Sequence, residues 1–140
     1  MSFYLLFKDS SLAYKNSKGQ LGNGTTEDSL TPVTALAVGV QAVTVGEDFT
    51  CVTTLSSVVR CWGNDGLGQL GDSASHDDSA VPTLVDPLPA DVLEVRSGQG
   101  HTCSLHVSGA VYCWGQNNRG QLGNGGNQGS GIPVQVSGLP

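Results

Sequence analysis

The chain has 140 residues, of which 38% are hydrophobic and 13% charged, so it is long enough for one domain and too apolar for a disordered segment. Its net charge of −6 disfavours nucleic-acid binding, because an acidic surface repels phosphate backbones. No apolar run approaches the ~20 residues of a membrane span. Residues 3–7 lack the basic start and the small-residue cleavage site of a signal peptide, so we expect no signal peptide in this chain.

Taken in chain order, the predicted elements are all short strands. Residues 3–7 predict a strand that forms a hairpin with residues 12–14. Further runs rich in β-branched and aromatic residues then follow, at 32–36, 42–45, 49–55, 58–62, 81–85, 92–98, 100–105, 110–114 and 132–136. No stretch has helical periodicity. We group 32–36 with the three strands after it, and 81–85 with the three after that, which predicts an all-β chain with four strands per unit.

A glycine-rich sequence, Gly-Gln-Leu-Gly, occurs three times. This box begins at Gly19, Gly68 and Gly120, at intervals of 49 and 52 residues. Other residues keep the same interval, since Cys51 and Cys103 are 52 apart. A period near 50 residues is typical of solenoids and propellers. Four antiparallel strands repeated radially form a propeller blade, which is stable only when neighbouring blades cover it.

The repeated sequences CWGNDGLGQLGD, YCWGQNNRGQLGNG and GHTCSL followed by CWG resemble the repeats of the RCC1 (regulator of chromosome condensation) family, in the form common in bacterial proteins. The resemblance covers about residues 16–140 and implies a seven-bladed β-propeller for a complete family domain. The chain would hold two to three blades of it, as a partial propeller from a longer protein. We expect one repeat region over 1–140, comprising a divergent hairpin (1–15), two repeats (16–64 and 65–115) and the start of another (116–140).

The repeated motif residues are interpreted as architecture. We expect the box leucines to point inward, the tryptophans to pack between blades and the glycines to form tight connections. A phosphate loop is disfavoured because no helix follows the box. The motif residues are Trp62, Gly63, Gly68, Leu70, Gly71, Trp114, Gly115, Gly120, Leu122 and Gly123.

The four cysteines form two pairs with identical spacing, Cys51 with Cys61 and Cys103 with Cys113. Each pair falls opposite across a predicted hairpin, near disulfide geometry. The alternative is two buried free thiols in each blade. Zinc is disfavoured because the chain has no CxxC sequence. If the pairs are disulfides, the protein works in an oxidising place, such as a periplasm or cell surface.

The three histidines are not expected to be catalytic. His101 corresponds to Phe49 in the preceding repeat, which favours packing, while His106 and His76 are expected to be solvated. We find no serine or cysteine with a recognisable base partner, so we predict no enzymatic activity. We also expect no metal or cofactor. The glycosylation sequence at residues 23–25 is common by chance.

The function predicted from this reading is a protein-interaction scaffold. Its contacts would come from the loops at 25–31, 72–80 and 126–132, which differ among the copies while the framework repeats. The identity of the protein partner is unknown. The alternatives are a guanine-nucleotide exchange factor for a small GTPase, by family analogy alone, and a secreted inhibitor or adhesion module. Open blade faces also predict self-association.

Overall fold

The computed structural model describes residues 3–5, 15–36, 39–72 and 76–139. It contains ten strands and, in these ranges, no helix. The strands are β1 (Phe3–Leu5), β2 (Val33–Leu36), β3 (Val40–Val45), β4 (Phe49–Thr54), β5 (Val59–Gly63), β6 (Ser79–Leu84), β7 (Val92–Ser97), β8 (His101–His106), β9 (Val111–Gly115) and β10 (Ser130–Gln135). The prediction of an all-β chain is confirmed.

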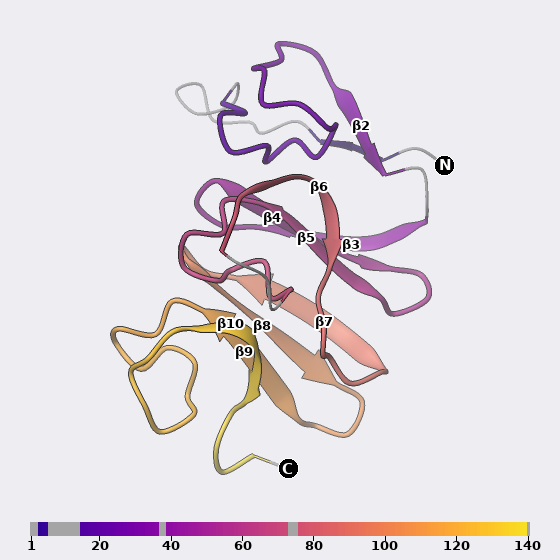
Figure 1. The fold of residues 1–140 in the computed structure, drawn as a ribbon. Helices are drawn as coiled ribbons and strands as arrows, with labels where there is room; N and C mark the ends of the chain where they lie inside the picture. The colour runs from indigo at the N-terminus through magenta and orange to yellow at the C-terminus, as the bar shows by residue number, and fades with distance from the viewer. Residues whose placement is uncertain (1–2, 6–14, 37–38, 73–75, 140) are drawn as a thin grey trace.

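These strands form three antiparallel sheets that stack along the molecule (Figure 1). Sheet one pairs β1 with β2, sheet two has the order β3-β4-β5-β6, and sheet three has the order β10-β9-β8-β7. Strands that follow each other in sequence therefore lie side by side, as in a propeller blade. The structure is that of a partial propeller.

The grouping of strands predicted from the sequence is wrong in one respect. Strand β2 pairs with β1 rather than with β3, and the fourth strand of sheet two is β6. Each sheet thus ends with the strand that was assigned to the next unit. The cause is the long connection after each box, which returns the chain to the outer edge of the same sheet. Of the predicted N-terminal hairpin, the strand at 12–14 lies outside the described residues.

Two prolines, Pro82 and Pro133, lie inside β6 and β10. Both strands occupy the outer edge of their sheet, where a residue without an N–H group breaks no ladder.

Most of the core lies between the sheets. Between sheets two and three it joins, among others, Phe49, Cys51, Leu70, Val95 and Trp114. Between sheets one and two, Val52 and Trp62 pack against Ala35, Leu36 and Val40. Adjacent residues of a strand point to opposite faces, so Cys61 faces sheet three while Trp62 faces sheet one. Each sheet is stabilised by the sheets beside it rather than by a core of its own.

Candidate interaction surface

A buried polar residue precedes each box by three positions. These anchor residues are Asn16, Asp65 and Asn117, and each has an exposed fraction of at most 1%. In each case the side-chain Oδ1 accepts a hydrogen bond from the N–H of the box leucine, at 2.9, 2.8 and 2.9 Å. These residues were not predicted from the sequence, although their intervals of 49 and 52 residues match those of the boxes.

Two of the anchors also hold the loop that follows their box. Asn16 Nδ2 donates to the carbonyl oxygens of Thr25 and Glu27, both at 2.9 Å. Asn117 Nδ2 donates to the carbonyl oxygens of Gly126 and Gln128, at 3.1 and 2.9 Å. The anchors also contact a few loop side chains, since Asn16 N–H donates to Asp28 Oδ1 and Asn117 Nδ2 donates to Asn124 Oδ1. The other loop side chains can differ while these backbone bonds keep the loop in place.

The middle anchor is an aspartate, which cannot donate these bonds when ionised. Its own N–H donates to Asp78 Oδ1 at 2.9 Å, just as the N–H of Asn16 donates to Asp28 Oδ1 at 2.7 Å. Burial raises the pKa of the Asp65 carboxyl, and the hydrogen bond from Leu70 N–H opposes that rise. The ionised aspartate therefore lowers the stability of the folded chain through the desolvation of its charge, which the two neutral asparagines avoid.

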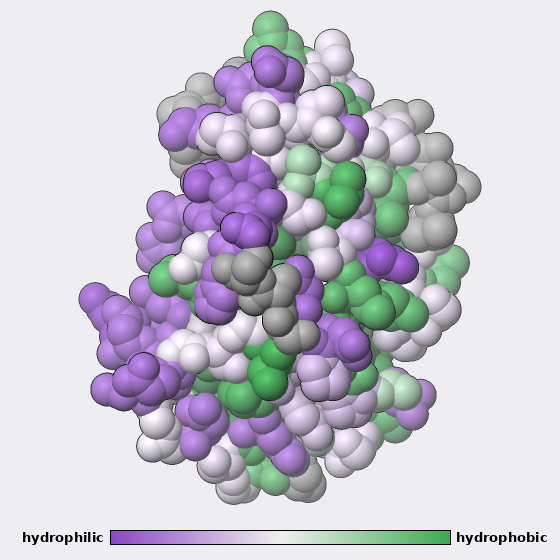
Figure 2. Space-filling view, viewed as in Figure 1, coloured by the Kyte–Doolittle hydropathy of each residue, from purple (hydrophilic) through white to green (hydrophobic). Residues whose placement is uncertain are grey.

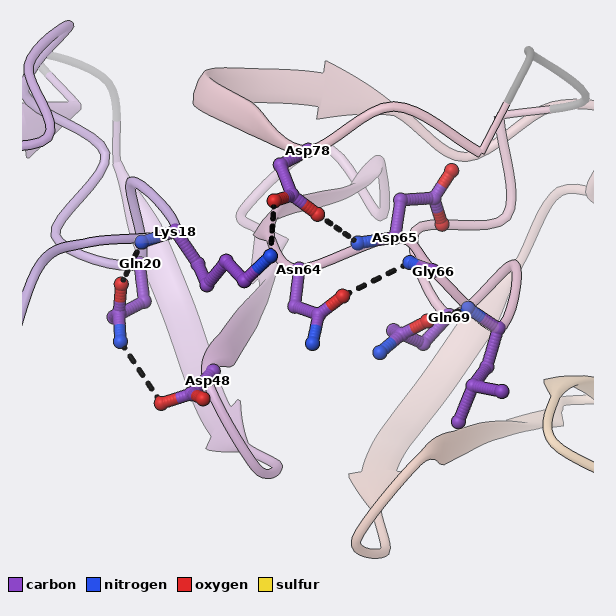
Figure 3. A network of polar contacts seen from close by, with 9 residues as sticks. Lys18, Gln20, Asp48, Asn64, Asp65, Gly66, Gln69 and Asp78 are labelled. Carbon is purple, nitrogen blue, oxygen red and sulfur yellow. Dashed lines mark hydrogen bonds and ion pairs between the residues drawn. The ribbon is translucent and has the colours of Figure 1, made fainter.

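The first box contacts sheet two through a polar network, shown in Figure 3. Lys18 Nζ lies 2.8 Å from Asp78 Oδ2, and Gln20 Nε2 donates to Asp48 Oδ1 at 3.0 Å. The hydrogen bond with Asp78 and the charge of that carboxylate raise the pKa of Lys18. These contacts place the side chains of one repeat against the next.

The tryptophans connect each sheet to the box before it. Trp62 Nε1 donates to the carbonyl oxygen of Gln20 at 2.8 Å, and Trp114 Nε1 donates to that of Gln69 at 3.0 Å. Both indoles are fully buried. A Cβ atom on Gly22 would lie 2.5 Å from the Trp62 indole, and one on Gly71 would lie 2.7 Å from Trp114. The closing glycine of the box is therefore required for the close approach of the ring.

The other predicted motif residues lie at the same junctions. Leu70 and Leu122 are fully buried, as is their counterpart Leu21 at 3% exposure. Gly63 and Gly115 end β5 and β9 against the backbone of the turn before the neighbouring strand. Gly68, Gly120 and Gly123 have positive φ within the box connections. Together these residues form the framework of the repeat.

The structure places the two cysteine pairs at disulfide distance, with S–S separations of 2.11 and 2.12 Å. In the ladders, Cys51 is directly opposite Cys61 and Cys103 is directly opposite Cys113. Within the described ranges no cysteine remains free, and no three His, Cys, Asp or Glu side chains gather as a metal site would require.

The histidines differ from the prediction in one case. His76 is exposed, as expected, but His106 is 3% exposed rather than solvated. Its two ring nitrogens lie 3.0 Å from Ser104 Oγ and from the carbonyl oxygen of Ala90. The Tyr112 ring contacts it edge-on. The connection before β7, which carries Ala90, contacts this side chain, and proximity to the hairpin tip alone did not indicate that contact.

The same contact corrects a second expectation, because Ser104 does have a histidine partner. Ser104 is nonetheless fully buried, so no substrate can reach its hydroxyl group. The pair satisfies buried polar atoms and is not a nucleophile with its base. His101 packs against Gly98, just as Phe49 packs against Gly46. Burial lowers the pKa of His101.

The box loops lie along one side of the molecule, at the left in Figure 1. Hydrophilic residues gather there in Figure 2. The described parts of the three predicted contact loops are largely exposed, including residues 25–28, 76–78 and 126–129. Several of their acidic groups are used internally, since Asp28 accepts from Asn16 N–H and Asp78 pairs with Lys18. The presence of acidic side chains in these loops is therefore not evidence that the partner is basic.

The stacked four-stranded sheets, with a box that covers the tryptophan of the next sheet, define a propeller-type repeat protein. The model of the regulator of chromosome condensation (RCC1) repeat matches residues 15–53, 59–105 and 108–140, and a second model of that description matches 92–121. The chain therefore belongs to the RCC1 repeat family, as the sequence resemblance predicted.

Curated relatives are similar over most of the chain. The ultraviolet-B receptor UVR8 of Arabidopsis thaliana is 34% identical over 89% of the chain and 29% of its own length. Human E3 ubiquitin-protein ligase HERC2 is 30% identical over 89% of the chain and 3% of its length. The secretion-regulating guanine nucleotide exchange factor of Bos taurus is 34% identical over 71% of the chain and 22% of its length. The chain thus spans less than a third of these relatives.

Solved structures share the fold. Prp20p of Saccharomyces cerevisiae has a TM-score of 0.76 at 19% identity, over 86% of this chain and 32% of Prp20p. Human WBSCR16 has a TM-score of 0.76 at 22% identity, over 88% of this chain and 32% of WBSCR16. The Prp20p work concerns its binding to Gsp1p and histones, and yeast RCC1 (Prp20) has also been solved with Kap60 bound.

In the described ranges, no helix is present that could cross a membrane.

Proposed function

We propose that this chain is a non-enzymatic protein-interaction module of the RCC1 type, and that its contacts come from the loops at 25–31, 72–80 and 126–132. The observation that carries the proposal is the way two of these loops are held. Asn16 and Asn117 bind loop carbonyl oxygens, so the loop side chains that the anchors do not contact remain available for recognition. A rigid framework with variable exposed loops is a common arrangement for binding.

The proposal is tested with side chains that the framework does not use. The loop variant carries Thr26→Ala, Glu27→Ala, Asn127→Ala and Gln128→Ala, which leave the anchored carbonyl groups intact. The control variant carries Leu55→Ala and Val107→Ala, which are 74% and 65% exposed at the hairpin tips, at the other end of the strands. A partner is first captured from the organism's own extract and identified, and its affinity for each purified variant is then measured.

We expect the loop variant to weaken the partner at least about tenfold, equivalent to ~1.4 kcal/mol. The tip variant should bind as the wild type does. Unchanged affinity in the loop variant, or loss in the tip variant alone, contradicts the proposal.

A second candidate is nucleotide exchange on a small GTPase, which the similarity to the Bos taurus exchange factor supports. No residue of this chain is assigned to that activity. The test is the release rate of a fluorescent guanine nucleotide from purified small GTPases. Acceleration by this chain supports exchange, and an unchanged rate supports binding alone. Ligase activity is not assigned, because the chain covers only 3% of HERC2.

A further inference from the structure

The second box holds a buried amide group whose donor is not used. Gln69 is 1% exposed, and its Oε1 accepts a hydrogen bond from Leu67 N–H at 2.8 Å. Within the described residues its Nε2 has no hydrogen-bond acceptor, and Figure 3 shows no bond from this nitrogen to the residues drawn. Buried polar groups are nearly always hydrogen-bonded, so an unused donor indicates a place for a ligand or water.

The first junction explains why this amide has no protein partner. Gln20 occupies the same position in the first box, and its Nε2 donates to Asp48 Oδ1 at 3.0 Å. The residue of sheet three that corresponds to Asp48 is Gly100, 52 positions further along the chain. Glycine has no side chain that could accept the bond. The second junction therefore lacks the carboxylate that completes the first.

A hollow of about 140 Å³ lies at this position, between the second box and the turn before β8. A Cβ atom on Gly100 would lie 3.0 Å from both Gln116 Oε1 and Leu67 Cδ1, so these groups border the space that the glycine leaves. Sheets two and three both contribute to the site, where Glu47 N–H donates to the Gln99 carbonyl oxygen at 2.8 Å. The volume equals the share of about five water molecules in the liquid, which suits a small ligand.

The groups around the hollow supply both donors and acceptors. Glu47 Oε2 accepts from Gln99 Nε2 at 2.7 Å, which leaves Glu47 Oε1 for a ligand. Asn64 also lines the hollow and uses its Oδ1 as an acceptor, which leaves its Nδ2 to donate. Together with Gln69 Nε2, two amide donors and one carboxylate oxygen thus surround one small space.

A hydroxyl group matches this set, because it donates and accepts with one atom. It can accept from Gln69 Nε2 while it donates to the Glu47 carboxylate. An anion would be repelled by Glu47, and an ammonium group has no acceptor for the amide. A peptide amide has one donor and one acceptor, whereas a sugar ring presents several hydroxyl groups to the several groups of the site.

We propose that the hollow formed by Glu47, Asn64, Leu67, Gln69 and Gly100 binds a single sugar ring. Ring hydroxyl groups bind Gln69 Nε2 and the Glu47 carboxylate, and the Leu67 side chain covers the C–H face of the ring. The ring is a free sugar or the end residue of a glycan. This carbohydrate-binding activity goes beyond the proposed protein-interaction module and does not use the variable loops, so either proposal can fail while the other stands.

Binding is tested by NMR on the isotope-labelled intact chain, whose side-chain amide signals report directly on the site. The probes are the methyl glycosides of glucose, galactose, mannose and N-acetylglucosamine, with N-methylacetamide as the peptide-like comparison. We expect a saturable shift of the Gln69 and Asn64 amide signals with at least one glycoside. Gln20 is the internal control, because its amide is already bonded to Asp48 and its signal should not move.

The free sugars are compared with the methyl glycosides to distinguish the two sources of a ring. A methyl glycoside has a blocked anomeric carbon, as the end residue of a glycan has. Binding of the glycoside supports a site for glycan ends, and binding of the free sugar alone supports a site for free sugars.

Two variants test the groups that form the site. Glu47→Gln should weaken glycoside binding about tenfold, because a hydrogen bond to a charged group is lost. Gly100→Asp should abolish binding, because its side chain fills the hollow. Gly100 does not have a positive φ, and a Cβ atom there meets only the ends of flexible side chains, so this variant should fold. Glu27→Gln, at an exposed carboxylate of the first loop, is the matched control and should leave binding unchanged.

Backbone amide spectra with the dispersion of the wild type show that each variant is folded, so that a loss of binding is a loss of the site. If Gly100→Asp does not fold, Glu47→Gln decides the test. The proposal is overturned by the absence of a saturable shift with every sugar, by a response to N-methylacetamide alone, or by glycoside binding that persists in folded Gly100→Asp or is unchanged in Glu47→Gln.

Discussion

The indole N–H of Trp114 donates to the carbonyl oxygen of Gln69 at 3.0 Å, across the boundary between sheets two and three. The equivalent bond joins Trp62 to Gln20 at 2.8 Å. Each sheet is thus fastened to the box before it at a buried point. This contact explains why the box and the tryptophan recur together.

Trp114→Phe should destabilise the chain by about 1–3 kcal/mol, because it leaves a buried carbonyl oxygen without its donor. Trp114→Ala should cost more, about 3–5 kcal/mol, because it also leaves a cavity. The free energy of unfolding is measured by denaturant titration. Leu55→Ala, at an exposed position, is the control and should change it by less than about 0.5 kcal/mol. Equal stability of Trp114→Phe and wild type would show that the bond is dispensable.

Gly22→Ala should be much more harmful than Gly125→Ala. Both glycines have positive φ, at 70° and 84°, so both substitutions carry a backbone cost of about 1–2 kcal/mol. A Cβ atom on Gly22 also meets the Trp62 indole, whereas nothing lies within 4 Å of one on Gly125. Thermal unfolding of the two variants measures the difference. Similar melting temperatures would contradict the close packing of the ring on the box.

Asp65→Asn should stabilise the protein at neutral pH by about 1 kcal/mol, because it restores an amide like those of the other two anchors. The raised pKa of Asp65 means that the folded state favours the protonated carboxyl. The free energy of unfolding contributed by this group therefore falls as the pH rises from its ordinary pKa of 3.8 through the raised one.

The measurement is denaturant unfolding of wild type and Asp65→Asn from pH 3 to pH 7. The advantage of the variant should grow with pH. Asn117→Asp is the converse control and should lose stability over the same range. A variant that is less stable than wild type at pH 7 would show that the carboxylate is well compensated.

Both cysteine pairs are predicted to be oxidised in the native protein. Thiol titration in denaturant without reductant should then find no free thiols, and full reduction should release four. Reduction should lower the free energy of unfolding by about 2–3 kcal/mol for each short loop. Four titratable thiols in freshly isolated protein would favour the alternative of buried free cysteines, and with it a reducing compartment.

We also predict self-association through the face of sheet three that points away from sheet two. Cys51 and Val59 are buried between sheets, whereas their counterparts Cys103 and Val111 are half-buried and Leu105 is 37% exposed. Exposed apolar sheet faces favour association. Light scattering should show a mass that rises with concentration. A constant monomer mass would contradict it.

The repeat made much of this structure predictable. The spacing of boxes, cysteines and tryptophans indicates sheets that recur, and the opposed cysteines follow from hairpin geometry. The assignment of β2 and β6 to their sheets was not predictable from strand content, because it depends on where a long loop returns. The prediction that His106 is solvated was wrong for a similar reason, since its burial depends on the Ala90 carbonyl group, 16 residues away. The anchors were overlooked because a lone Asn or Asp in a loop is typical of a turn.

The most direct test of the account is hydrogen exchange of the two indole N–H protons, followed by NMR. If each box fastens the tryptophan of the next sheet, the Trp62 and Trp114 protons should exchange only through global unfolding, with protection that matches the free energy of unfolding. Rapid exchange of either proton under native conditions would show that the junction opens locally, and would contradict the account of a chain held together at its boxes.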